Sequence, residues 1–176
     1  MTKEFIFAGF GGQGMLLIGK FMAMACMLDG KHVSWLPSYG PEMRGGSANC
    51  SVIISDEEIG SPLVNYPDIL VALNRPSFDK FASKVKPGGT LLVDSTLVNV
   101  KCDRDDINVV YVPATGLAND NNISGAANVI MLGQILKQTK LFDYDAFLKL
   151  LVGAIPETKK ALIERNTLAL KLGYDF

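Results

Sequence analysis

The sequence predicts an α/β fold with three layers, in which helices cover both faces of a mixed, mostly parallel sheet and the C-terminal part is helical. Short apolar runs typical of buried strands alternate with helical patterns through most of the chain. A glycine-rich turn joins the first apolar run to the first helix, as in α/β sheets that bind ligands at one edge. The 176 residues suit one hydrophobic core without a linker or repeat, so we expect a single domain over residues 1–176.

The composition is that of a globular protein near the apolar end of the ordinary range. Hydrophobic residues make up 48% of the chain and charged residues 20%, which excludes a disordered chain. The formal net charge of -1 creates no overall field that favours nucleic acid or an anionic membrane. We therefore expect no nucleic acid partner, and an anionic ligand has to be held by local geometry.

Targeting signals and cysteine patterns indicate a cytoplasmic protein without a membrane span. The N-terminus leads directly into a strand pattern and does not resemble a signal peptide. The most apolar stretch, Met15–Leu28, is interrupted by Lys20 and is too short to cross a bilayer. Cys26, Cys50 and Cys102 lie far apart and form no CxxC pair, so we expect buried thiols and no disulfide framework or cysteine-ligated cluster.

The first half of the chain predicts three strands and one helix. The apolar run Glu4–Ala8 is a buried strand, and Met15–Leu28 is a helix with apolar residues on nearly all sides, which a second layer or another chain has to cover. His32–Leu36 and Ala48–Ser55 are the next strands. The segment Pro37–Ser47 between them has no helical period, whereas a parallel crossover usually contains a helix. We therefore expect an antiparallel step and a mixed sheet.

The second half predicts three further strands, then a helical end. The strands are Asp68–Asn74, Thr90–Asp94 and Ile107–Val112, and a helix over Pro76–Val85 begins with proline. A polar loop is expected over Thr115–Ser124 because it is rich in asparagine. The remaining helices are Ala126–Thr139, Tyr144–Ala154 and Glu157–Leu172, the last opened by Pro156 and closed by Gly173.

The run Gly9-Phe10-Gly11-Gly12-Gln13-Gly14 fits the pattern G-x-G-x-x-G between a strand and a helix. Glycines at such a turn let backbone N–H groups approach a phosphate at the positive end of the helix. A dinucleotide site also needs an acidic residue at the end of the second strand, but that strand runs into Pro37-Ser38-Tyr39. Two interpretations stay open: an anion-binding turn, or glycines that only let the helix pack on the strand.

A second pattern lies in the loop before the third strand, where Arg44 is followed by Gly45 and Gly46. A guanidinium beside exposed backbone N–H groups suits a phosphate or a carboxylate. The alternative is an internal ion pair, for example with Glu42. If the first two strands run parallel, this loop and the glycine turn share the carboxyl edge of the sheet, where open α/β sheets bind ligands.

Three other segments are expected at the same edge: Asn74-Arg75-Pro76, Asp94-Ser95-Thr96 and Ala114-Thr115-Gly116. The single histidine, His32, starts a strand, and the chain contains no Gly-x-Ser-x-Gly, HExxH or Walker A sequence. No nucleophile, acid–base pair or metal site stands out. The sequence therefore indicates a subunit of a larger enzyme rather than a self-contained catalyst.

The run AGFGGQGMLLIGK followed by SYGPEMRGGSANCSVIIS resembles the gamma subunit of 2-oxoacid:ferredoxin oxidoreductases. The resemblance continues through PDILVALN, KPGGTLLVDS, PATGLA and NVIMLG, and so covers the chain to about Gly133. It implies a three-layer α/β/α fold in a cytoplasmic complex that oxidatively decarboxylates a 2-oxoacid, expected to be 2-oxoglutarate or pyruvate. Coenzyme A (CoA) takes the acyl group there, and ferredoxin or a similar carrier takes the electrons.

The same resemblance implies a division of labour among subunits. Thiamine diphosphate, magnesium and iron–sulfur clusters are expected on alpha and beta subunits and on a ferredoxin-like delta subunit, and no cofactor on this chain alone. The gamma subunit is expected to help bind CoA and close the active site, with Arg44 as the residue for a CoA phosphate or a partner contact. The candidate cofactor-binding residues are Gly9, Gly11, Gly12, Gln13, Gly14, Arg44, Gly45 and Gly46.

Two other functions remain as alternatives at this stage. One is a stand-alone NAD(P)-binding, Rossmann-like oxidoreductase, which the missing ribose-binding acid disfavours. The other is an assembly module whose glycine turn serves only for packing. Binding of NAD or of CoA would distinguish the first alternative from the gamma subunit.

Overall fold

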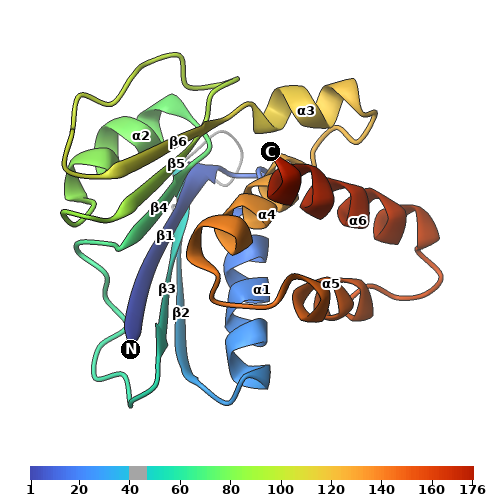
Figure 1. The fold of residues 1–176 in the computed structure, drawn as a ribbon, viewed down its shortest axis with the longest axis horizontal. Helices are drawn as coiled ribbons and strands as arrows, with labels where there is room; N and C mark the ends of the chain where they lie inside the picture. The colour runs from blue at the N-terminus through green and yellow to red at the C-terminus, as the bar shows by residue number, and fades with distance from the viewer. Residues whose placement is uncertain (40–46) are drawn as a thin grey trace.

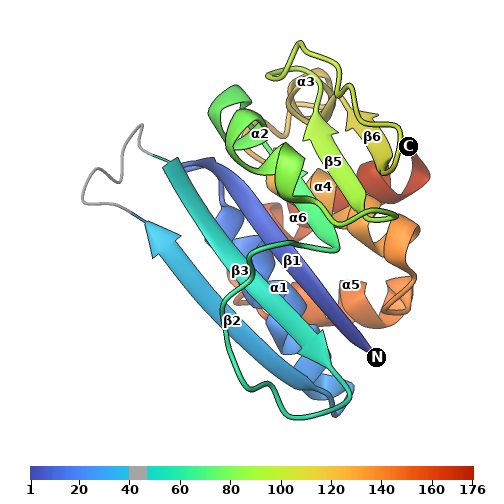
Figure 2. The same ribbon diagram turned by 90° about the vertical axis from the view of Figure 1, so that its left-hand side faces the viewer.

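The computed structural model describes residues 1–39 and 47–176, and the described residues form one sheet of six strands in the order β2-β3-β1-β4-β5-β6 (Figures 1 and 2). The strands are β1 Thr2–Phe10, β2 His32–Tyr39, β3 Ser47–Ser55, β4 Ile69–Ala72, β5 Thr90–Asp94 and β6 Asn108–Val112. β3 pairs antiparallel with both of its neighbours, and the other three pairings are parallel. The expected mixed sheet with an antiparallel step is therefore confirmed.

Helices lie on both faces of this sheet and so make the expected three layers (Figure 1). They are α1 Met15–Leu28, α2 Arg75–Phe81, α3 Ala114–Asp120, α4 Ala127–Thr139, α5 Tyr144–Gly153 and α6 Lys160–Asp175, with a 3-10 turn over Ala82–Lys84. The bounds expected for α1 and β5 agree with the structure to the residue. One face of the sheet is covered by α2 and the 3-10 turn that follows it. The helices α1, α4, α5 and α6 gather on the other face.

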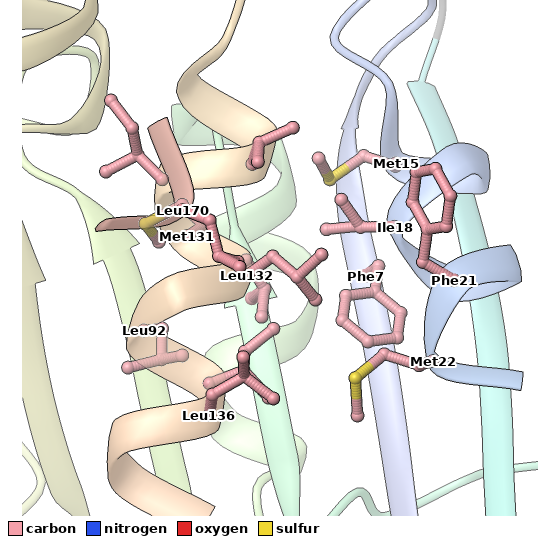
Figure 3. Close-up of a cluster of buried hydrophobic side chains, with 14 of the residues drawn as sticks. Phe7, Met15, Ile18, Phe21, Met22, Leu92, Met131, Leu132, Leu136 and Leu170 are labelled. Atoms are coloured by element: carbon pink, nitrogen blue, oxygen red, sulfur yellow. The ribbon is translucent and has the colours of Figure 1, made fainter. Parts of the chain in front are cut away.

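Alternation along the strands divides the apolar side chains between two cores. In β1, Phe5 and Phe7 face α1 and α4, whereas Ile6 and Ala8 face α2. The larger core, shown in Figure 3, includes Met131, Leu132 and Leu136 of α4 and four labelled side chains of α1. Both helices begin at the same edge of the sheet, because Asn128 in the first turn of α4 donates a hydrogen bond to the carbonyl oxygen of Gly14, which precedes α1.

The helix α1 is less completely covered than its composition suggests. Met15 and Met22 are buried in the core, as expected for apolar filler. Met27 and Leu28 at its C-terminal end are exposed to 65% and 78%. Neighbouring elements of the same chain therefore cover most, but not all, of this helix.

The expectation that Gly173 ends the last helix is wrong, because α6 begins at Lys160 and continues through Gly173 to Asp175. A Cβ on Gly173 would lie 1.8 Å from the carbonyl oxygen of Ile130, and one on Gly133 would lie 2.3 Å from the carbonyl oxygen of Leu170. These glycines let the backbones of α4 and α6 approach each other closely. Their role is helix packing rather than helix termination.

The polar loop expected over Thr115–Ser124 is also wrong for its first part, which forms the helix α3. Two influences outside local propensity favour this helix. Ala114 and Ala118 are buried in the larger core, and the carboxylate of Asp94 accepts hydrogen bonds from the first turn through Thr115. Tertiary contacts therefore override the polar, asparagine-rich sequence.

Among the described residues, no helix has both the length and the apolar character needed to cross a membrane.

Candidate functional site

The candidate site lies at the carboxyl edge of the sheet, where β1, β4, β5 and β6 end. The glycine turn follows β1 and leads into α1, and α4 begins next to it. Ligands of open α/β sheets bind at this edge because loops and helix N-termini meet there. Neither α1 nor α4 has a side chain that caps its first turn, so backbone N–H groups at both N-termini stay available.

The side chain of Gln13, a predicted cofactor-binding residue, is engaged inside the fold. Its Oε1 accepts a hydrogen bond from the backbone N–H of Phe10 at 2.6 Å, and its Nε2 donates to the carbonyl oxygen of Leu73 at 3.2 Å. Asn74 also donates to Oε1 at 3.4 Å. Gln13 therefore fixes the glycine turn to the end of β4, and both the oxygen and the nitrogen of its amide have partners within the fold.

The glycines of the turn have different surroundings. A Cβ on Gly9 would lie 2.7 Å from Gln13 Oε1, and a Cβ on Gly14 would lie 2.2 Å from Asn128 Nδ2, so both positions are needed for packing. Gly12 has a φ of +98° and open space where a Cβ would be. The space beside the Gly12 backbone is therefore open, and its role in binding stays a prediction.

A buried carboxylate anchors the other wall of the site. Asp94, at the end of β5, is fully buried and accepts hydrogen bonds from the backbone N–H and hydroxyl of Thr115 and from the N–H of Thr96. Thr96 in turn accepts from the N–H of Gly116 at 3.0 Å. The segments after β5 and β6, expected at this edge from the sequence, are thus joined to each other there.

A cavity of about 200 Å³ lies between the glycine turn, α3 and the start of α4. Apolar side chains form much of its wall: Leu73, Leu97, Ala118 and Ala127. Gly12 and Gly125 also line the cavity. Arg165 of α6 donates a hydrogen bond to the carbonyl oxygen of Gly125 at 3.1 Å and so holds the segment between α3 and α4 in place. The cavity can take a slender, largely apolar group.

Asn128 is the residue of the cavity that the sequence reasoning missed as a site residue. It is only 5% exposed, and its Nδ2 donates to the carbonyl oxygen of Gly14 at 3.3 Å. Its Oδ1 is buried and accepts no hydrogen bond from the residues that the structure describes. The one sequence signal is its position in NVIMLG, which carries part of the family resemblance.

Arg44, Gly45 and Gly46 lie outside the described residues, so their predicted roles stay predictions. β2 extends to Tyr39, beyond its expected end at Leu36, and β3 begins at Ser47, one residue before the expected Ala48. β1 and β2 run in the same direction because both are antiparallel to β3, and Phe10 of β1 pairs with Ser47 at the start of β3. Tyr39 at the end of β2 and Ser47 at the start of β3 therefore lie at the edge of the sheet where the glycine turn follows β1.

The same topology removes the structural basis of a dinucleotide site. In a Rossmann fold the strand that carries the ribose-binding acid is a parallel neighbour of the first strand. Here the neighbour of β1 on that side is the antiparallel strand β3, and β2 lies one position further out. The arrangement does not support the NAD(P)-dependent alternative.

Cysteine chemistry is not available at the two buried thiols. Burial raises the pKa of Cys50 to about 12 and that of Cys26 to about 11, so both stay protonated near neutral pH. Cys50 lies under the start of α1, where its Sγ donates to the carbonyl oxygen of Met15 at 3.4 Å. In the part of the chain that the structure describes, no three His, Cys, Asp or Glu residues are grouped to hold a metal ion.

The fold is a three-layer α/β domain whose carboxyl edge carries a glycine turn and the N-termini of α1 and α4. Comparison with known proteins gives the family. The chain belongs to the pyruvate ferredoxin/flavodoxin oxidoreductase family, whose model matches residues 4–176.

Two curated relatives differ in how much of their length this chain covers. The 2-oxoglutarate synthase subunit KorC of Methanocaldococcus jannaschii is 38% identical over 99% of this chain and 94% of its own length. The ketoisovalerate oxidoreductase subunit VorA of Methanothermobacter thermautotrophicus is 47% identical over 73% of this chain, but the match spans only 27% of VorA. The homologues are subunits of 2-oxoacid:ferredoxin oxidoreductases, which are oxidoreductases, so the family resemblance is confirmed.

Solved structures confirm the fold. The gamma subunit of a keto/oxoacid ferredoxin oxidoreductase from Geobacter sulfurreducens superposes with a TM-score of 0.86 at 33% identity, over 99% of this chain and 95% of that chain. The 2-oxoglutarate:ferredoxin oxidoreductase of Magnetococcus marinus, solved with 2-oxoglutarate, coenzyme A and succinyl-CoA bound, shares the fold with a TM-score of 0.89 at 21% identity. The match covers 99% of this chain and 30% of that chain.

Proposed function

We propose that this chain is the gamma subunit of a complex that converts a 2-oxoacid, CoA and oxidised ferredoxin to acyl-CoA, carbon dioxide and reduced ferredoxin. When the bond to the carboxylate breaks, carbon dioxide leaves and the electron pair of that bond stays on the acyl carbon. Two electrons then pass to ferredoxin, and the acyl group passes to the sulfur of CoA, whose thiol proton is released. The chain's part is to bind CoA and to close the active site. The relatives act on different 2-oxoacids, so the proposal names the substrate class only.

The observation that carries this proposal is the cavity between the glycine turn and α4. Its rim offers the backbone of Gly12 and two helix N-termini without side-chain caps, which favour the phosphates of CoA. Its inner wall is apolar and narrow, which suits the uncharged arm of the same molecule. Coenzyme A combines these two chemical characters in one ligand.

The remaining chemistry is assigned to partner subunits. In the proposed complex, thiamine diphosphate with magnesium and the iron–sulfur clusters are bound by alpha, beta and ferredoxin-like delta subunits, where they supply carbanion stabilisation and electron transfer. The matched region is 27% of VorA but 94% of KorC. CoA binding is supported by the fold shared with the Magnetococcus marinus enzyme, which was solved with coenzyme A bound.

The test is to purify the alpha, beta and delta subunits with and without this chain. Reduction of a low-potential dye is then measured against 2-oxoacid and CoA concentration. We expect CoA-dependent turnover only when the chain is present, and none from the chain alone. Equal turnover and an equal apparent KM for CoA without the chain would contradict the proposal, as would decarboxylation of a 2-oxoacid by the isolated chain.

A further inference from the structure

The Oδ1 atom of Asn128 has no hydrogen-bond partner among the described residues. It is also shielded from water, because Asn128 is only 5% exposed. A buried acceptor without a partner costs about 1–3 kcal/mol, so such atoms are rare in native proteins and call for a ligand or a water. Asn128 also lines the cavity, whereas the other such buried atom, Arg165 Nε, lies on α6 outside the cavity lining.

The nitrogen of the Asn128 side-chain amide, Nδ2, fixes the orientation of that amide. Nδ2 donates to the carbonyl oxygen of Gly14, and the contact is so close that any side chain on Gly14 would collide with it. A flipped amide would place Oδ1 against that carbonyl oxygen, and two acceptors would repel each other. The amide is therefore held between α4 and the glycine turn with Oδ1 as its free acceptor.

The other polar side chains of the cavity are already used. Both amide atoms of Gln13 bind Phe10, Leu73 and Asn74, and the hydroxyl of Thr115 donates to Asp94. No lysine, arginine or histidine of the described residues lines the cavity. A ligand group inside it thus meets side-chain acceptors on Asn128 and Thr115 but no unused side-chain donor among the described residues. It also meets apolar walls and the first turn of α4, which has no side-chain cap.

This set of groups selects among ligand chemistries. A phosphate or carboxylate offers no proton to Oδ1 at neutral pH, so its oxygens and Oδ1 repel each other. A secondary amide carries both a donor for Oδ1 and an acceptor for a helix N–H, on a narrow chain that fits apolar walls. A water molecule satisfies Oδ1 as well but leaves the apolar walls without contacts.

We propose that this cavity binds a secondary amide of the pantetheine arm of CoA, with Asn128 Oδ1 accepting the amide N–H. This assignment rests on the proposed function and deepens it, because it places the uncharged arm in the cavity and the phosphates outside it, at the rim. Asn128 is then a binding residue for the uncharged arm of CoA, in addition to the residues that the sequence analysis named for CoA binding.

The experiment uses the complete complex and two partial ligands as competitive inhibitors against CoA. Pantetheine carries both amides and no phosphate, whereas 3′,5′-ADP carries phosphates and no amide. In the Asn128→Leu complex we expect inhibition by pantetheine to weaken roughly tenfold, as for one lost buried hydrogen bond, while inhibition by 3′,5′-ADP stays unchanged. The apparent KM for the 2-oxoacid also stays unchanged.

Gln134→Leu is the matched control, because Gln134 is a buried carboxamide on the same helix that donates to Gly173 and does not line the cavity. It should leave both inhibition constants unchanged. If Asn128→Leu fails to assemble, Ala127→Leu serves instead, since Ala127 is half-buried and lines the cavity, and a leucine there fills it. The same selective loss of pantetheine inhibition is expected.

Unchanged pantetheine inhibition in both cavity variants would overturn the inference, and so would selective loss of 3′,5′-ADP inhibition, which would place phosphates in the cavity. Equal weakening of both inhibitors would also overturn it, because that result means general damage to the CoA site. The proposed function fails separately, if the wild-type complex does not need this chain for CoA-dependent turnover.

Discussion

Gln13 and Leu73, sixty residues apart in the chain, are joined by a hydrogen bond from the Gln13 side-chain amide to the Leu73 carbonyl oxygen at 3.2 Å. This bond connects the glycine turn after β1 to the end of β4, so the turn has a fixed place on the sheet. The glutamine in GxGGQG thus holds the turn in place against the sheet.

Replacing Gln13 by leucine should lower the free energy of unfolding by about 1 kcal/mol, because the N–H of Phe10 and the carbonyl of Leu73 lose their partner. Urea denaturation of the purified chain measures this difference. Gln138→Leu is the control, since Gln138 is exposed and bonds only to Gln134. A change within 0.5 kcal/mol is expected there. Equal effects of the two substitutions would contradict a bracing role for Gln13.

Gly173→Ala should destabilise the chain by about 3 kcal/mol or more, because the new Cβ meets the backbone of Ile130 at 1.8 Å and backbone atoms cannot move aside cheaply. Gly153→Ala, in the helix α5, has nothing within 4 Å of its new Cβ. It should be neutral or stabilise by up to about 1 kcal/mol, as alanine is the better helix former. Thermal unfolding compares the two variants, and similar melting temperatures would contradict the close crossing of α4 and α6.

Gly12→Ala separates ligand binding from backbone strain. Gly12 and Gly30 both have a positive φ and open space around the new Cβ, but Gly30 lies at the opposite end of α1. Both substitutions should cost about 1–2 kcal/mol of stability. Only Gly12→Ala should raise the apparent KM for CoA in the assembled complex, by several-fold, because only its Cβ obstructs approach to the turn. Equal CoA kinetics in the two variants would remove Gly12 from the site.

Alkylation by iodoacetamide at pH 8 should modify Cys102 before Cys26 and Cys50. Burial raises the pKa values of Cys26 and Cys50 to about 11 and about 12, so at pH 8, below both values, these thiols hold their protons and lack the reactive thiolate. Cys102 is only half-buried. Peptide mass spectrometry at successive times measures the order in which the three cysteines are alkylated. As a control, Cys26 and Cys50 should react once urea unfolds the chain. Early alkylation of Cys50 in the native chain would show that α1 does not cover it.

The sequence predicted the parts of the fold that local patterns control. The bounds of α1 follow from Gly14 before it and from Asp29-Gly30 after it, and the antiparallel step follows from a loop too irregular for a crossover helix. The helix α3 was missed because a buried carboxylate, Asp94, and core contacts stabilise it against its own composition. Gly173 was misjudged because the reason for a glycine there, the backbone of Ile130, comes from another helix.

The position of the candidate site in the fold could be predicted from the sequence more easily than the contacts of its residues. The strand ends that meet at the carboxyl edge were expected to meet there, since parallel strands bring their ends together. The engagement of Gln13 and the free acceptor of Asn128 depend on contacts over 60 and 114 residues of sequence separation. No periodicity or spacing carries that information.

Hydrogen–deuterium exchange on the complete complex, with and without CoA, tests the central claim most directly. CoA should slow exchange at Gly9–Gly14 and at Gly125–Asn128, because its binding covers the glycine turn and the N-terminus of α4. The helix α5, Tyr144–Gly153, lies away from this edge and should exchange equally in both states. Protection elsewhere in the complex, with no change in these two segments, would contradict the assignment of the carboxyl edge as the CoA-binding surface of this chain.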